Sequence, residues 1–145
     1  GYSVSTLSAA ISGVMGLTML QPVVMVGVGN LGSALLRYSG FRKEGFEIIA
    51  AFDAEPANVK ATTEQMGVPV HDVADLGRYV SAHGVRMAII AVPESAGQLV
   101  ADVLVASGVQ AILNFSPAVL SVPDEVVVNH VDLAAELGSL SFFVS

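Results

Sequence analysis

The stretch Val23-Val24-Met25-Val26-Gly27-Val28-Gly29-Asn30-Leu31-Gly32 sets three glycines in the pattern GxGxxG directly after four apolar residues. A continuous apolar run is typical of a parallel strand that is buried on both faces. In the turn that follows, Gly27 allows a tight bend, Gly29 lets the backbone approach a pyrophosphate, and Gly32 lets a helix pack closely on the strand. The stretch therefore predicts a strand, a phosphate-binding turn and a helix whose first N–H groups favour an anion.

Apolar runs alternate with helical segments along the rest of the chain. Six segments are predicted as strands, over residues 23–26, 46–52, 68–70, 87–92, 111–115 and 126–131. Helices are predicted over 56–66, 72–84 and 95–106, besides the one that follows the glycines. Because crossovers of this length between parallel strands are right-handed, we predict an α/β doubly wound parallel sheet, the Rossmann fold.

Asp53 stands at the end of the second predicted strand, about twenty positions beyond Gly32. A carboxylate at this place accepts hydrogen bonds from the ribose hydroxyls of adenosine. The same charge would repel a 2′-phosphate, so NAD and NADH are favoured over NADP. The alternative is that Asp53 only begins a turn before Pro56 and that the glycines are ordinary loop residues.

Two further loops, Val92-Pro93 and Asn114-Phe115-Ser116, follow the fourth and fifth predicted strands. The carboxyl ends of parallel strands line one crevice, so we expect both loops beside the cofactor. Pro93 and Pro117 could instead simply terminate strands. The predicted cofactor-binding residues are Gly27, Val28, Gly29, Asn30, Leu31, Gly32, Asp53, Val92, Pro93, Asn114, Phe115 and Ser116.

Composition excludes several classes of function. The 145 residues fit one domain, and a net charge of −7 with six Lys and Arg predicts that the chain alone does not bind DNA. Cysteine is absent from the sequence, so a redox response would need a bound cofactor. The histidines at positions 71, 83 and 130 share no metal-ligand spacing, and no metal site is predicted.

The segment 9–36 is apolar and precedes the first charged residue, Arg37, which raises the question of a membrane span or a signal peptide. Gln21-Pro22 interrupts this segment, and it has no basic beginning. We therefore expect a cytoplasmic domain with no membrane partner.

The order and spacing of the motifs resemble the regulatory domain of the Rex family, bacterial repressors that sense the NADH/NAD ratio. The resemblance covers residues 1–145 and is much more specific than the glycine pattern alone. Its pieces are 26–32, Ala34-Leu35, Tyr38, Gly40-Phe41, Gly45-Phe46, Phe52-Asp53, Gly108, 112–117, Asn129 and 131–133.

The resemblance implies a homodimer in which each Rossmann domain holds one NADH or NAD. Residues 1–20 would be a helix following a winged-helix DNA-binding domain that the chain lacks, 21–131 the core, and 132–145 a C-terminal dimerisation helix exchanged with the partner subunit. Operator DNA would be contacted only through the absent winged helix. NADH would close the dimer and release the operator, whereas NAD would bind more weakly and permit DNA binding.

By position, the resemblance assigns Tyr38 and Asp132 to coupling between the cofactor and the subunit arrangement, and it places Leu133 near the nicotinamide across the dimer. From the residues alone, Tyr38 could be an ordinary half-buried aromatic at a helix end, and Asp132 could also be an N-cap. Charge gives a physical reason for the weaker binding of NAD, because an oxidised nicotinamide carries a positive charge that a closed apolar pocket disfavours.

Two rival functions share this fold. The nucleotide domain of a dehydrogenase would need a substrate site and an acid or base near the nicotinamide, often supplied by a second domain, and neither is recognisable in the sequence. The chain is therefore not expected to be an enzyme. A CoA-binding module of the ligase type shares the sheet and the glycine loop, but Asp53 favours a ribose with a free 2′-OH.

Overall fold

The structure is a computed structural model, and it describes residues 20–132 of the chain. Within that part, no helix is long and apolar enough to span a bilayer. The helices expected at 1–20 and from Asp132 onward fall almost entirely outside the described residues.

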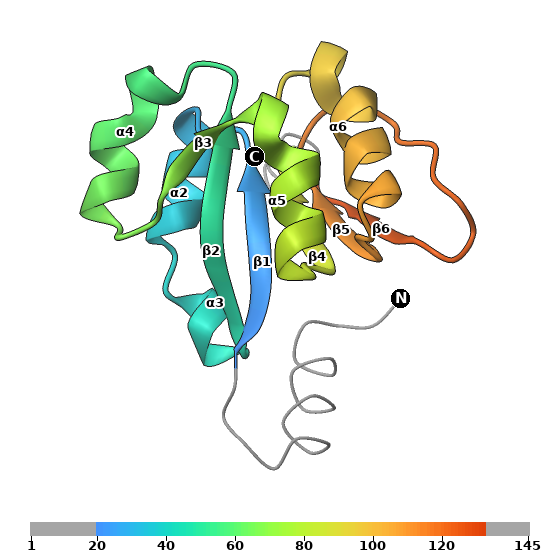
Figure 1. Cartoon of the computed structure of the whole chain (residues 1–145), viewed down its shortest axis with the longest axis horizontal. Helices are drawn as coiled ribbons and strands as arrows, with labels where there is room; N and C mark the ends of the chain where they lie inside the picture. Colours follow the sequence, from blue (N-terminus) through green and yellow to red (C-terminus); the bar gives the residue numbers. More distant parts are fainter. Residues whose placement is uncertain (1–19, 133–145) are drawn as a thin grey trace, which may run out of the picture.

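Six parallel strands form one sheet in the order β3-β2-β1-β4-β5-β6 (Figure 1). The first strand lies in the middle of this sheet; the chain then moves to one edge, returns to the middle and moves to the other edge, which confirms the predicted doubly wound topology. The strands are β1 (Gln21–Val26), β2 (Phe46–Asp53), β3 (Val70–Asp72), β4 (Met87–Ile90), β5 (Ala111–Asn114) and β6 (Val127–His130).

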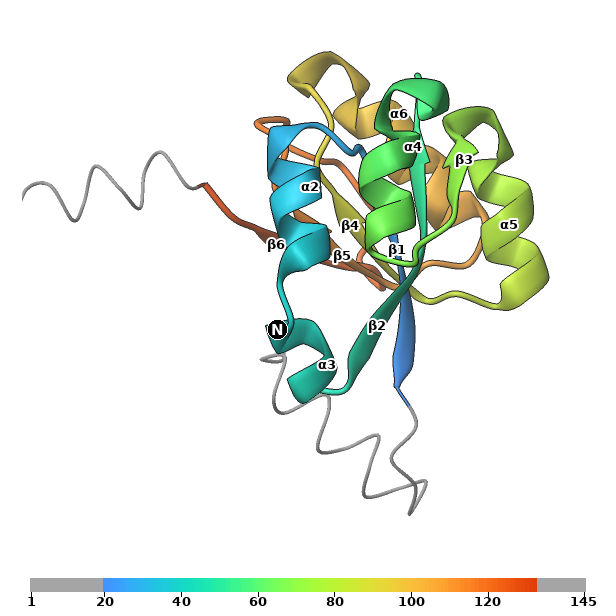
Figure 2. The same cartoon turned by 90° about the vertical axis from the view of Figure 1, so that its left-hand side faces the viewer.

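Helices cover both faces of the sheet (Figure 2). Val24, Val26 and Phe52 pack in one buried cluster with side chains of α5 and α6, whereas Val23 and Met25 pack on the opposite face toward α2 and α3. Both faces of β1 are therefore buried, as its continuous apolar run predicts. The helices are α2 (Asn30–Arg37), α3 (Gly40–Lys43), α4 (Pro56–Gln65), the 3-10 turn η1 (Val73–Asp75), α5 (Leu76–His83) and α6 (Glu94–Ala106).

The register between β1 and β2 contains one irregularity. Val23 pairs with Ile48, but Val24 pairs with Ala50, so Ile49 is an extra residue in β2. Bulges of this kind change which face the following side chains occupy. Ile48 accordingly packs on the α2 side of the sheet, whereas Ala50 lies in the cluster under α5 and α6.

The third strand begins two residues later than predicted. Val68 N donates to Thr63 O at 2.9 Å, so its N–H closes the turn after α4 and is not available to the sheet. Pro69 has no N–H to give to the sheet, and only its carbonyl takes part, accepting from Ala51 N at 2.9 Å. Ladder pairing can therefore start only at Val70.

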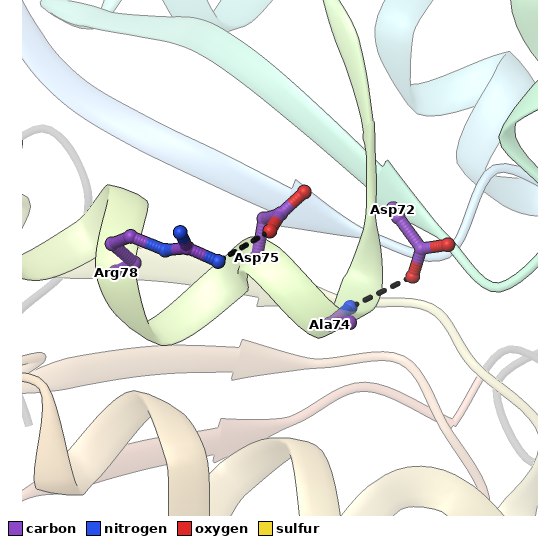
Figure 3. A network of polar contacts seen from close by, with 4 residues as sticks. All are labelled: Asp72, Ala74, Asp75 and Arg78. Carbon is purple, nitrogen blue, oxygen red and sulfur yellow. Dashed lines mark hydrogen bonds and ion pairs between the residues drawn. The ribbon is translucent and has the colours of Figure 1, made fainter.

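The entry into α5 is held by two acidic side chains (Figure 3). Asp72 Oδ1 accepts a hydrogen bond of 2.9 Å from Ala74 N, which caps η1. Asp75 and Arg78 form an exposed ion pair of 2.8 Å one turn later. The helix ends at Gly84, whose φ of +61° is the left-handed conformation that glycine adopts at helix ends.

Candidate functional site

The turn after β1 needs glycine at its first position. Gly27 has a φ of +98°, and its N–H donates to Phe52 O at 2.8 Å. A Cβ on Gly27 would lie 2.5 Å from Ala91 O, on the loop after β4. The chain therefore bends tightly between two neighbouring strand ends, and no other residue type fits there.

The other two glycines of the motif differ in their surroundings. A Cβ on Gly32 would lie 2.1 Å from Gly27 O, so Gly32 permits the first turn of α2 to pack on the turn beneath it. A Cβ on Gly29 would meet nothing within 4 Å. Gly29 is also the N-cap of α2 and provides no side-chain cap. The open space and the uncapped helix end are what a bound phosphate group requires.

Asp53 is attached to this turn by a hydrogen bond. Its Oδ2 accepts from Val28 N at 2.9 Å, and its Oδ1 accepts from Glu55 N at 2.8 Å. Each carboxylate oxygen has two lone pairs, so the group retains capacity for ribose hydroxyls. Asp53 therefore has a structural contact that the sequence pattern did not suggest, in addition to the predicted ribose contact.

These elements border a cleft of about 750 Å³ at the carboxyl ends of β1, β2 and β4. Within residues 20–132, Asp53 is the one charged residue that lines it. The walls are mainly apolar side chains and glycine backbone, which suits a planar organic ring better than a free inorganic ion. The predicted site residues that line the cleft are Gly27, Val28, Gly29, Asn30, Leu31, Asp53, Val92, Pro93 and Phe115.

Three predicted cofactor residues do not line the cleft. Gly32 lies beneath the turn, while Asn114 and Ser116 are buried in the loop after β5. Asn114 donates to Ala118 O at 2.9 Å, and Ser116 Oγ accepts from Ala118 N at 3.2 Å. Direct contact of Gly32, Asn114 and Ser116 with a cofactor stays a prediction.

One wall of the cleft was missed by the sequence analysis. Leu99 and Val103 of α6 line it, together with Val73 of η1 and Leu76 at the start of α5. Leu99 is 70% exposed although it is a large apolar side chain. The apolar side chains Leu99 and Val103 recur at helical spacing, which was the available signal, but periodicity does not distinguish a ligand wall from a core face.

Tyr38 and Asp132, which the resemblance assigned to coupling, are not among the residues that line the cleft. Tyr38 follows the last turn of α2, is 60% exposed, and contacts Phe41 edge to face with ring centroids 5.0 Å apart. Asp132 is exposed at the end of the described chain, and Leu133 lies outside it. Coupling through Tyr38, Asp132 and Leu133 stays a prediction.

Histidines and carboxylates form no metal centre in the part of the chain that the structure describes: no group of three or more lies close enough to hold an ion. Two of the histidines pack with Tyr79, which stacks on His83 at a centroid distance of 3.9 Å and lies 5.2 Å from His71. Burial raises the pKa of Tyr79 above its ordinary value. None of these three rings lines the cleft.

Comparison with known proteins identifies both the fold family and a closer family. Residues 19–118 match the family model described as CoA binding domain. The redox-sensing transcriptional repressor Rex of Chloroflexus aggregans is 43% identical over 145 residues, which is 100% of this chain and 68% of that protein. Rex of Streptomyces griseus subsp. griseus is 49% identical over 142 residues, which is 98% of this chain and 55% of that protein. The chain thus spans only part of the length of these relatives.

Solved structures agree with the sequence comparison. RSP, a Rex-family repressor, superposes with a TM-score of 0.78 at 31% identity, covering 99% of this chain and 68% of RSP. RSP in complex with β-NADH gives a TM-score of 0.79 at 32% identity, over 99% of this chain and 69% of RSP. RSP with β-NAD+ and operator DNA gives the same two values, over 99% and 65%.

The relatives named here are repressors, which favours the regulatory interpretation over a dehydrogenase. The CoA binding domain model matches residues 19–118, whereas the Rex relatives match over nearly the whole sequence. The chain therefore belongs to the CoA binding domain family over residues 19–118 and, over its whole length, to the Rex family of redox-sensing transcriptional repressors.

Proposed function

We propose that the cleft binds NADH and NAD and that the chain is the regulatory part of a repressor that senses their ratio. The observation that carries this proposal is an apolar cleft in which one carboxylate, Asp53, is fixed beside an open glycine turn at the N-terminus of α2. The crystal structures of RSP in complex with β-NADH, and with β-NAD+ and operator DNA, support this proposal.

The cleft suggests one orientation for the dinucleotide. The pyrophosphate lies over Gly29, where there is space, and the adenosine ribose donates to Asp53. The nicotinamide lies toward Val92, Pro93 and Phe115, at the ends of the central strands. Asn114 and Ser116 then act by shaping the loop that carries Phe115.

Discrimination between the two redox states follows from charge. The oxidised nicotinamide is a cation, and the reduced ring is neutral. A cation loses hydration energy in an apolar pocket, so a cleft that closes over the ring favours NADH. Closure involves a second copy of the chain in a homodimer, with residues 132–145 exchanged and with Tyr38, Asp132 and Leu133 at the junction.

Release of operator DNA is a property of a longer protein. Residues 1–20 connect to a winged-helix domain in that protein, and the chain described here, with a net charge of −7, repels the phosphate backbone. The protein acts in the cytoplasm, where operator DNA and the NADH pool are both accessible.

Calorimetric titration of the chain with NADH, NAD, NADPH and coenzyme A tests the proposal. We expect tight binding of NADH, weaker binding of NAD and little binding of the other two. Equal affinity for NADH and NAD would remove the sensing mechanism. Binding of coenzyme A without binding of NADH would replace the proposal with the CoA-binding function.

Asp53→Arg tests the ribose contact separately. The variant should weaken NADH binding and admit NADPH, because an arginine can pair with the 2′-phosphate. An unchanged preference for NADH over NADPH would mean that Asp53 does not contact the ribose.

A further inference from the structure

The side chain of Asn114 makes the central contacts of the loop after β5. It is fully buried, with an exposed fraction of 0%. Its Oδ1 accepts from Ser116 N at 3.0 Å, its Nδ2 donates to Ala118 O at 2.9 Å, and the same Nδ2 lies 3.0 Å from His130 Nδ1 on β6. The loop between Asn114 and Ala118 is therefore closed around one amide group.

The orientation of this amide is fixed by its two main-chain partners. If the amide were turned over, its NH₂ group would face the N–H of Ser116, and its oxygen would face the carbonyl of Ala118. In this buried site a donor would then face a donor and an acceptor would face an acceptor, and each unpaired group would cost free energy. The NH₂ group must therefore point toward Ala118 and His130.

This orientation determines the protonation of His130. The Asn114 NH₂ group can only donate, so His130 Nδ1 must accept. An accepting Nδ1 carries no hydrogen, which leaves the ring neutral with its hydrogen on Nε2. The hydrogen bond thus selects one of the three forms of the imidazole.

We propose that His130 is a positioning residue for the cofactor pocket, which as the neutral Nε2–H form holds Asn114 and thereby the loop whose Phe115 lines the cleft. The proposal rests on the proposed binding of NADH, because it concerns the affinity of the same cleft. It assigns to β6, an edge strand that does not line the cleft, a role in shaping it.

Acid should disturb this arrangement. A protonated imidazole carries hydrogen on both nitrogens, so Nδ1–H would oppose the Asn114 NH₂ group. The sheet neighbour of β6 is β5, which presents the uncharged Asn114 to the ring. On the segment of His130 itself, the nearest acidic residue is Asp132, two positions later, and Asp124 and Glu125 precede the strand. Asn114 would lose one partner or turn, and Phe115 would move with it.

Two variants of His130 separate its roles. His130→Asn keeps a hydrogen-bond acceptor near the position of Nδ1 but cannot be protonated, whereas His130→Leu removes the acceptor. NADH affinity is measured at pH 8 and pH 5.5, a range in which histidines change charge. The control is His83→Asn, which removes an exposed histidine that does not line the cleft.

We expect His130→Leu to weaken NADH binding at pH 8 by about fivefold, roughly the effect of one hydrogen bond. His130→Asn should bind like the unsubstituted chain at pH 8 and should lose less affinity at pH 5.5. His83→Asn should keep the full acid effect. Two results together would overturn the inference. They are an unchanged NADH affinity in His130→Leu, and a loss of NADH affinity at pH 5.5 that is as large in His130→Asn as in the unsubstituted chain.

A spectroscopic measurement decides the case if His130→Leu does not fold. Nitrogen-15 NMR of the imidazole in the unliganded chain should show a hydrogen on Nε2 and an unprotonated Nδ1 at pH 8. A ring with its hydrogen on Nδ1 would overturn the inference without any reference to NADH. If the unsubstituted chain fails to bind NADH, the first titration overturns the proposed function and the cofactor role of His130 with it.

Discussion

The main-chain N–H of Val28 donates a hydrogen bond of 2.9 Å to Asp53 Oδ2, so the end of β2 is attached directly to the turn that follows β1. The proposed ribose contact and the shape of the proposed phosphate-binding turn are therefore not independent. A ligand that binds Asp53 meets a carboxylate whose orientation is already fixed, which reduces the entropy lost on binding.

Asp53→Asn separates the charge of this residue from its shape. An asparagine has one acceptor oxygen, so its NH₂ group would face either Val28 N–H or Glu55 N–H, and one of the two hydrogen bonds would be lost. We expect the free energy of unfolding to fall by about 1–2 kcal/mol and NADH affinity to fall as well. Urea denaturation and NADH titration measure the two effects.

The matched control for that variant is Asp72→Asn. The hydrogen bond that caps η1 uses one carboxylate oxygen of Asp72, which the asparagine oxygen can replace. Stability and NADH affinity should therefore change little. A loss as large as that of Asp53→Asn would contradict a special role for the contact between Asp53 and Val28.

The first two glycines of the motif should respond differently to substitution by alanine. Gly27→Ala forces a side chain into a φ of +98° and against Ala91 O, so we expect a loss of about 3 kcal/mol or more in the free energy of unfolding. Gly29→Ala should leave thermal stability nearly unchanged, because its Cβ meets open space. Its NADH affinity should nevertheless fall, since the methyl group occupies the proposed pyrophosphate position. Normal affinity in Gly29→Ala would show that the phosphate lies elsewhere.

Leu99→Ala tests the wall that α6 contributes. Leu99 is largely exposed, so its truncation should change the free energy of unfolding by less than about 0.5 kcal/mol. If the adenosine half of the ligand covers this side chain, NADH affinity should fall about three- to fivefold, equivalent to roughly 1 kcal/mol of buried apolar area. Val119→Ala is the control, because Val119 is 89% exposed and does not line the cleft. Equal effects in the two variants would exclude a ligand contact at Leu99.

Tyr79 should make the stability depend on alkaline pH. Burial raises its pKa above the ordinary value of 10.0, so the folded chain retains the phenol hydrogen to a higher pH than the unfolded chain does. The unfolded state then binds fewer protons, and this contribution to stability is lost as the pH rises above about 10. Thermal unfolding between pH 8 and pH 11 should show a smaller decline in Tyr79→Phe. Tyr38→Phe, at an exposed site, should keep the full decline.

The core of the fold could be predicted because its signals are local. The GxGxxG turn, the apolar run before it and Asp53 follow one another within the first βαβ unit, and each requires a particular residue type at a particular place. The six strands and the doubly wound parallel sheet followed from the alternation of apolar runs with helical segments and from the right-handedness of crossovers. The predicted start of β3 was two residues too early, because Pro69 accepts a hydrogen bond from the neighbouring strand but has no N–H to donate.

The remaining features of the site depend on contacts between distant segments. Nothing in the sequence around Asn114 indicates that its amide forms hydrogen bonds with Ala118 and with His130, which lies sixteen residues further along the chain. The wall formed by Leu99 was hidden for a different reason, since an apolar helical face is the same signal whether a core or a ligand covers it. Both features became visible only when the sheet brought the segments together.

The number of residues in β2 after its bulge sets the side of the sheet to which Asp53 points. Phe46, Ile48, Ala50 and Phe52 alternate in the sequence as if they shared one face, yet the bulge at Ile49 divides them between two. Deleting Ile49 itself would only restore regular pairing, because Ile48 and Ala50 would then be adjacent and would still face opposite sides. Deleting a residue between Ala50 and Phe52 would instead exchange the sides to which Phe52 and Asp53 point. In evolution the end of this strand can therefore accept substitutions far more readily than changes of length, because a single deletion beyond the bulge would move the carboxylate of Asp53 away from the turn after β1.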